Sequence, residues 1–141
     1  MTSFDLFGYQ VEIDKTATRA WYDTADEWGC ECGHCRNFLE LARSRMLPGA
    51  IMEQLDSLDI PLEKATYVCE LYTDSDGVHY QFSYRVSGVI RSEPHTKAGL
   101  RVDLGRCCHE TYPYGAPGFP EPHFDLEFYV TLPWVLAEPE D

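Results

Sequence analysis

The chain has 141 residues, of which 44% are apolar and 13% aromatic. This length is typical of one domain with a sizeable hydrophobic core, and the composition excludes a disordered protein. No segment approaches the roughly 18 consecutive apolar residues of a membrane-spanning helix, so we expect no membrane partner. Eleven Lys and Arg against 24 Asp and Glu give a net charge of −13. A charge of this size repels phosphate backbones and argues against nucleic acid as a partner.

The number of cysteines is informative once the compartment is considered. Residues 1–5 do not begin a basic stretch followed by an apolar run, so the sequence shows no secretory signal and predicts a cytoplasmic location. Thiols stay reduced there. Six cysteines in a reducing compartment indicate metal binding or catalysis ahead of a disulfide framework.

Strands are predicted in the first part of the chain. Residues 3–13 alternate apolar and polar positions with a slip at Gly8, which predicts one bent or bulged strand. A second, short strand is expected over residues 17–22. Residues 23–29 form a polar segment before the cysteines, so the cysteines are predicted to lie on a loop.

Two amphipathic helices are predicted next, over residues 36–46 and 51–58. Apolar side chains recur there at steps of three and four. They are Phe38, Leu41, Ala42 and Met46 in the first helix and Ile51, Met52, Leu55 and Leu58 in the second. The Leu-Pro-Gly sequence at 47–49 separates the two helices. Pro61 ends the second because proline cannot donate to the helical hydrogen-bond ladder.

A β-hairpin is the clearest pattern of the second half. It consists of a strand over residues 66–73, a turn at 74–77 and a long strand from Val78. The register counted from this turn pairs Cys69 with Phe82 and places Cys69 in the core.

The long strand has two chemically different faces. We expect the apolar face to pack and the polar face to meet water. The apolar face consists of Val78, Tyr80, Phe82, Tyr84 and Val86, and the polar face of His79, Gln81, Ser83 and Arg85.

The remaining elements are a shorter strand over residues 100–104, a loop over 112–122 and a last strand over 124–132, before an acidic tail at 138–141. Four prolines in the loop favour an ordered shape, because they reduce the entropy lost on ordering. Taken together, residues 1–141 are predicted to form a single α+β domain. Its antiparallel β-sheet packs an aromatic face on the two consecutive helices.

The densest chemical signal is a cluster of three thiols, Cys30, Cys32 and Cys35, which we call the cysteine cluster. Zinc prefers four tetrahedral ligands drawn from thiolate and imidazole, and this spacing supplies three from one turn. The fourth is predicted to come from Cys107, Cys108 or His109, which follow a strand end. His34 is a weaker candidate. The start of a helix after the cluster stabilises thiolates, which serves metal binding and nucleophilic chemistry alike.

Two other interpretations of the cluster stay open. Cys32-Gly33-His34-Cys35 is the tetrapeptide of protein disulfide isomerases, so Cys32 and Cys35 could form a thiol-disulfide oxidoreductase site. Two helices in a row and strands gathered in the second half do not match a thioredoxin fold. In the other interpretation the cysteines are small buried apolar groups, and Cys69 fits this best.

The chain also resembles a family of small bacterial proteins over nearly its full length. The resemblance depends on the sequence Cys-Glu-Cys-Gly-His-Cys-Arg-Asn-Phe at 30–38, on Leu55 and Leu58 before Ile60, and on Phe-Tyr-Val-Thr-Leu-Pro-Trp-Val-Leu at 128–136. It implies a shared metal or structural knot and makes the residues at 33–34 incidental, because they vary in that family. No activity comes with it, so no catalytic residue is transferred.

The sequence therefore predicts a cytoplasmic zinc-binding protein that is a non-enzymatic binding or scaffold module with a protein partner. The first alternative is the thiol-disulfide oxidoreductase that uses Cys32 and Cys35. The second is an acidic inhibitor or immunity-type protein, in which the loop over residues 112–122 and the negative surface bind a basic partner.

Overall fold

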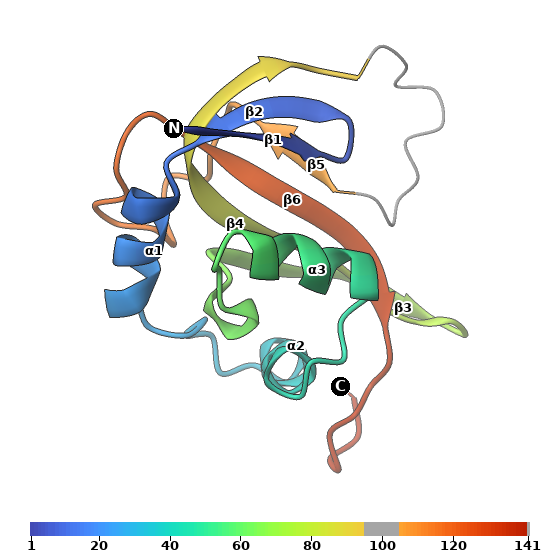
Figure 1. Cartoon of the computed structure of the whole chain (residues 1–141). Coiled ribbons are helices and arrows are strands. Elements are labelled where there is room, and N and C mark those ends of the chain that lie inside the picture. The colour runs from blue at the N-terminus through green and yellow to red at the C-terminus, as the bar shows by residue number, and fades with distance from the viewer. Residues whose placement is uncertain (95–104, 141) are drawn as a thin grey trace.

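The computed structural model describes residues 1–94 and 105–140. Within them, six antiparallel strands form one sheet, accompanied by three α-helices and a short 3₁₀ helix (Figure 1). The strands are β1 (Thr2–Leu6), β2 (Tyr9–Ile13), β3 (Tyr67–Asp74), β4 (Gly77–Ser92), β5 (Arg106–Cys108) and β6 (His123–Leu132). The helices are α1 (Lys15–Thr24), α2 (Gly33–Arg43), α3 (Gly49–Ser57) and η1 (Leu62–Lys64). The predicted α+β class with an antiparallel sheet is confirmed.

Strand β4 organises the sheet. The strand order is β1-β2-β4-β6-β5, and β3 pairs with the first half of β4 on the same edge that β2 occupies further along. On its other edge β4 pairs with β6 without interruption, from Val78 opposite Leu132 to Ser87 opposite His123. Strand β4 therefore pairs directly with three other strands, β2, β3 and β6, and sets their positions in the sheet.

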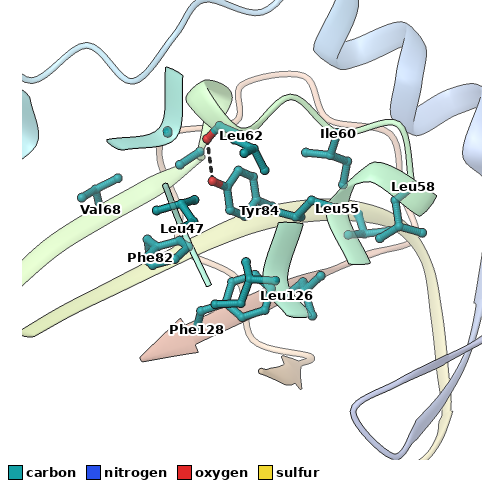
Figure 2. Close-up of a cluster of buried hydrophobic side chains, with 14 of the residues drawn as sticks. Leu47, Leu55, Leu58, Ile60, Leu62, Val68, Phe82, Tyr84, Leu126 and Phe128 are labelled. Atoms are coloured by element: carbon teal, nitrogen blue, oxygen red, sulfur yellow. Dashed lines mark hydrogen bonds between the residues drawn. The ribbon is translucent and has the colours of Figure 1, made fainter. Parts of the chain in front are cut away.

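The apolar face of the sheet packs on α2 and α3, as predicted (Figure 1). Phe38 of α2 lies on Phe82 of β4, with ring centroids 4.9 Å apart. Figure 2 shows the adjoining part of this core, where the buried Tyr84 hydroxyl donates to the carbonyl of Leu62 at 2.6 Å. That hydrogen bond satisfies a polar group inside an otherwise apolar cluster. Among the described helices, none combines the length and apolar character needed to cross a bilayer.

The N-terminal predictions are wrong in two places. Residues 3–13 are a hairpin of two strands, because Phe7 and Gly8 both have positive φ angles, of 54° and 89°, and form a tight turn. The expected strand over residues 17–22 is part of helix α1. Asp14 starts this helix, since its carboxylate accepts the N–H of Ala17 at 2.9 Å.

The predicted register of the β3–β4 hairpin is also wrong beyond the turn. A bulge lies at Leu71 in β3, so Cys69 pairs with Gln81 instead of Phe82. A shift by one residue turns a side chain to the opposite face of the sheet. Cys69 is consequently half-buried on the polar face, not in the core.

The polar face of β4 does not meet water as expected. Ser83 and Arg85 are buried, and Arg85 donates to the Tyr112 carbonyl of the loop over residues 109–122, which lies against this face. The Tyr112 ring stacks on Tyr67 with centroids 3.9 Å apart, and Trp21 Nε1 donates to the Pro117 carbonyl at 3.0 Å. The predicted ordered loop thus has a specific role as a cover. The predicted strand over residues 100–104 lies outside the described residues.

Gly88 permits the close approach of β2 to β4. A Cβ atom at this position would lie 2.2 Å from the carbonyl oxygen of Glu12. We expect Gly88→Ala to decrease the free energy of unfolding by about 2 kcal/mol, because the strands must separate to relieve the overlap. Urea unfolding measures this change.

Gly49→Ala is the matched control. No heavy atom lies within 4 Å of a Cβ built at Gly49, which begins α3. Alanine there is expected to keep the stability or to raise it by up to about 1 kcal/mol. Equal stability of the two variants would contradict the proposed strand contact.

Candidate metal centre

The three thiols of the cysteine cluster converge at the start of α2. Their sulfur atoms all lie within 4.8 Å of one another, and all six cysteines of the chain are free. In a tetrahedral zinc site with Zn–S bonds of about 2.3 Å, the sulfurs are about 3.8 Å apart. The cluster is close to that spacing. Within residues 1–94 and 105–140 it is the one group of three or more His, Cys, Asp or Glu side chains that could hold a metal ion.

The helix start sets the position of two of these sulfurs. Cys32 is the N-cap of α2, where its Sγ accepts the backbone N–H of Cys35 at 3.4 Å. The Cys32 carbonyl accepts the N–H of Arg36 at 2.9 Å, which is the first helical hydrogen bond. A cysteine thus takes the place usually held by serine or aspartate. Free amides and the positive end of the helix dipole favour negative charge at this position.

Trp28 also holds the Cys35 sulfur in place. Its indole Nε1 donates to Cys35 Sγ at 3.1 Å, and its backbone N–H donates to the Glu63 carbonyl at 3.2 Å. The second bond attaches the loop before the cluster to η1. Cys35 is only 7% exposed, whereas Cys30 and Cys32 are exposed. The cluster therefore has one buried sulfur and two that solvent reaches.

The thiols differ in acidity. The backbone N–H of Cys32 lowers the pKa of Cys30, and contacts with the other two thiols add to this effect. Burial raises the pKa of Cys35 to about 12, although the Trp28 indole opposes the shift. Without an ion, Cys35 is a neutral thiol at pH 7. A bound dication reverses that preference, because a coordinating thiol loses its proton.

Asn37 anchors the segment that follows β6 against the same helix. Its side chain is fully buried; Nδ2 donates to the Pro133 carbonyl at 3.1 Å, and Oδ1 accepts the Val135 N–H at 2.8 Å. Nδ2 also lies 3.2 Å from the Tyr80 hydroxyl, which donates to the His34 carbonyl at 2.6 Å. One amide side chain therefore joins α2, β4 and the segment that follows β6.

The predicted acidic tail is also attached to α2. Glu138 forms an ion pair with Arg36, and Glu140 lies 2.8 Å from His34 Nε2. The Arg36–Glu138 pair is half-exposed, so it contributes little to stability. His34, the weaker candidate for a fourth ligand, is bonded to Glu140.

The structure does not bring the second cysteine pair to the cluster. Cys107 and Cys108 lie on β5, opposite Leu126 and Asp125 of β6, at the edge of the sheet. Burial raises the pKa of both thiols, to about 12 for Cys108, whose Sγ donates to Glu127 Oε2 at 3.3 Å. His109 is exposed. None of the three belongs to the group formed by Cys30, Cys32 and Cys35.

A polar network on the covered face of the sheet was not predicted from the sequence. Glu127 is 4% exposed, and its Oε1 accepts from Gln81 at 2.7 Å, Tyr129 at 2.6 Å and Arg106 at 2.9 Å. Its side chain lines a pocket of about 510 Å³. Next to it, the buried Arg85 donates to Asp125 at 3.1 Å. Asp125 and Glu127 alternate with apolar residues along β6, and this pattern could have indicated the network. The same pattern is also typical of a strand face that meets water.

These hydrogen bonds decide the charge of Glu127. Burial raises the pKa of its carboxyl group, but donation from Tyr129, Arg106 and Cys108 outweighs burial, and the net pKa is lowered. The network therefore stabilises the ionised form inside the fold.

No model of a known protein family matches the chain, and no curated protein or solved structure matches it. The assignment of a function therefore depends on the geometry of the cysteine cluster and of the residues that hold it.

Asn37→Ala tests the anchor of the C-terminal segment. The substitution leaves the Pro133 carbonyl and the Val135 N–H without their partner, so we expect the free energy of unfolding to decrease by about 2–4 kcal/mol. Urea unfolding measures this, and faster hydrogen exchange at the Val135 amide should accompany it. Gln10→Ala, which removes an exposed amide that bonds Asp5 at 2.7 Å, should cost less than about 1 kcal/mol. A loss no larger than that of Gln10→Ala would refute the anchor.

Glu127→Gln tests the buried network through its pH dependence. The pKa of Glu127 is lower in the folded chain than its ordinary value of 4.5. Its contribution to stability is therefore complete above that value and is lost as the pH falls through the folded pKa. The unfolding free energy of Glu127→Gln should change less than that of the wild type between pH 6 and pH 3. The exposed Glu53→Gln should retain the wild-type slope, and identical slopes for all three proteins would exclude the role.

Proposed function

We propose that this protein binds zinc through Cys30, Cys32 and Cys35 and acts as a non-enzymatic binding or scaffold module in the cytoplasm, with a protein as its partner. The observation that carries the proposal is the convergence of three unbonded sulfur atoms within 4.8 Å. Thiolate ligands select zinc over magnesium or calcium, which prefer oxygen. The cytoplasm keeps such thiols reduced.

The surroundings of the cluster support an ion that organises structure. Its ligands come from the loop before α2, from the N-cap and from the first helical turn. The N–H groups of Cys35 and Trp28 donate to two of the sulfurs, an arrangement that stabilises metal-bound thiolates. An ion at this position would join the loop to a helix whose next turn holds the chain end through Asn37. Metal binding would therefore stabilise both segments together.

Metal content and stability test the proposal. Protein purified with a phosphine reductant and no chelator should contain one zinc per chain by elemental analysis. A strong chelator should lower its melting temperature, because zinc at a thousand times its Kd stabilises the fold by about 4 kcal/mol. Cys35→Ser should lose the metal, and Cys69→Ser should keep it, since Cys69 lies outside the cluster. Substoichiometric zinc, or a melting temperature insensitive to chelator, would exclude the site.

Thiol-disulfide exchange is the second candidate, and one observation favours it. Cys32 is exposed at the N-cap and Cys35 is buried one turn later, the order of attacking and resolving thiols in dithiol enzymes. The antiparallel sheet, however, is unlike the alternating strands and helices of a thioredoxin fold. Insulin reduction by zinc-free protein that is lost in Cys32→Ser would favour exchange over metal binding.

A further inference from the structure

The cysteine cluster supplies three donors to an ion that takes four. In the part of the chain that the structure describes, no fourth Cys, His, Asp or Glu side chain joins the group. Zinc sites with three protein ligands hold an exchangeable ligand in the fourth position, whereas closed structural sites take all four from the chain. The donor count therefore indicates a ligand from outside the cluster.

The cluster borders a pocket that a small molecule can enter. Cys30 and Trp28 line a cavity of about 640 Å³, whose charged residues are three bases and three acids: Arg36, Arg43, Lys64, Asp26, Glu27 and Glu31. Cys30 and Cys32 are exposed. A ligand in this cavity would lie beside Cys30, one of the two exposed thiols of the cluster.

The cations of the pocket are not equivalent. Arg43 is ion-paired with Glu27, and Arg36 with Glu138. Lys64 Nζ instead donates to the Tyr22 carbonyl at 2.6 Å and, among residues 1–94 and 105–140, has no carboxylate oxygen within 4.0 Å. Its ammonium group is therefore the one among the three cations that a ligand carboxylate can approach without displacing an ion pair.

We propose, on the premise of the zinc site above, that the fourth ligand is a small organic thiol that carries a carboxylate. Its sulfur binds the ion and its carboxylate lies beside Lys64. A site that already has three thiolates favours a further soft donor over oxygen. As the Zn–S bond forms, the thiol proton passes to solvent, and no atom changes its oxidation state. The activity is thus the capture of a thiol compound as a metal-bound thiolate.

Counting the sulfur ligands tests this proposal. X-ray absorption of the zinc protein, prepared with a phosphine reductant, should give three sulfur ligands before addition and four with 3-mercaptopropionate. Propionate, which lacks the thiol, should leave the count at three. Cobalt-substituted protein should show the same step as stronger sulfur-to-metal absorption, and titration of this signal gives the Kd for each probe.

Lys64→Met tests the second contact. It should weaken the binding of 3-mercaptopropionate about three- to fivefold and leave that of 2-mercaptoethanol, which has no carboxylate, unchanged. Lys15→Met is the matched control. It also removes a lysine, but one that pairs with Asp59 at 3.4 Å, and it should leave the binding of both thiols unchanged. An equal effect of Lys64→Met on both thiols, or none on either, would overturn the role of the carboxylate.

Other outcomes separate this inference from the proposed function. A metal site with three sulfurs that ignores saturating thiol overturns the inference and leaves the zinc module intact. So does a fourth protein ligand that disappears in Cys108→Ser, His109→Ala or His95→Ala. A protein that binds no metal overturns both proposals.

Discussion

The buried amide of Asn37 is the interaction on which the rest of the site depends. Asn37 is the single asparagine of the chain, and it completes the hydrogen bonds of two backbone groups that follow β6. The Asn37 amide is itself fully buried, and an unsatisfied polar group at its depth would cost more than most surface contacts contribute. The amide therefore fixes the orientation of α2, and with it the helix start that positions Cys32 and Cys35.

The sheet separates two chemically different environments. One face holds the apolar core beneath α2 and α3, and the other holds the ion pair of Arg85 with Asp125 and the network around Glu127 beneath a proline-rich loop. The cost of removing such charges from water offsets much of their mutual attraction, so a buried ion pair is weak evidence for added stability. The cysteine cluster lies at the margin of the apolar core. Cys35 is buried with the core at the start of α2, whereas Cys30 and Cys32 are exposed.

The sequence was sufficient to predict those parts of the fold and of the site that depend on local patterns of residues. The alternation from Val78 to Val86 and the helical spacing of Phe38, Leu41 and Ala42 predicted the core, and the spacing of the three cysteines predicted their convergence. Features that depend on distant residues or on a single residue were not predicted. The bulge at Leu71 reversed the face of Cys69, a short window left α1 indistinguishable from a strand, and no local pattern shows that Asn37 binds residues almost 100 positions away. Cys107 and Cys108 were predicted as candidate fourth ligands because zinc takes four and because they follow a strand end, but they lie on β5 and do not belong to the group of three thiols.

The hydrogen bond from Trp28 to Cys35 has an optical consequence. The indole ring that supports the buried sulfur is also a fluorophore, and its N–H contacts the atom whose charge changes when a thiol becomes a thiolate. An ion at the cluster would remove the proton from this sulfur and change the surroundings of the indole. Trp28 fluorescence would then report whether the cluster is occupied.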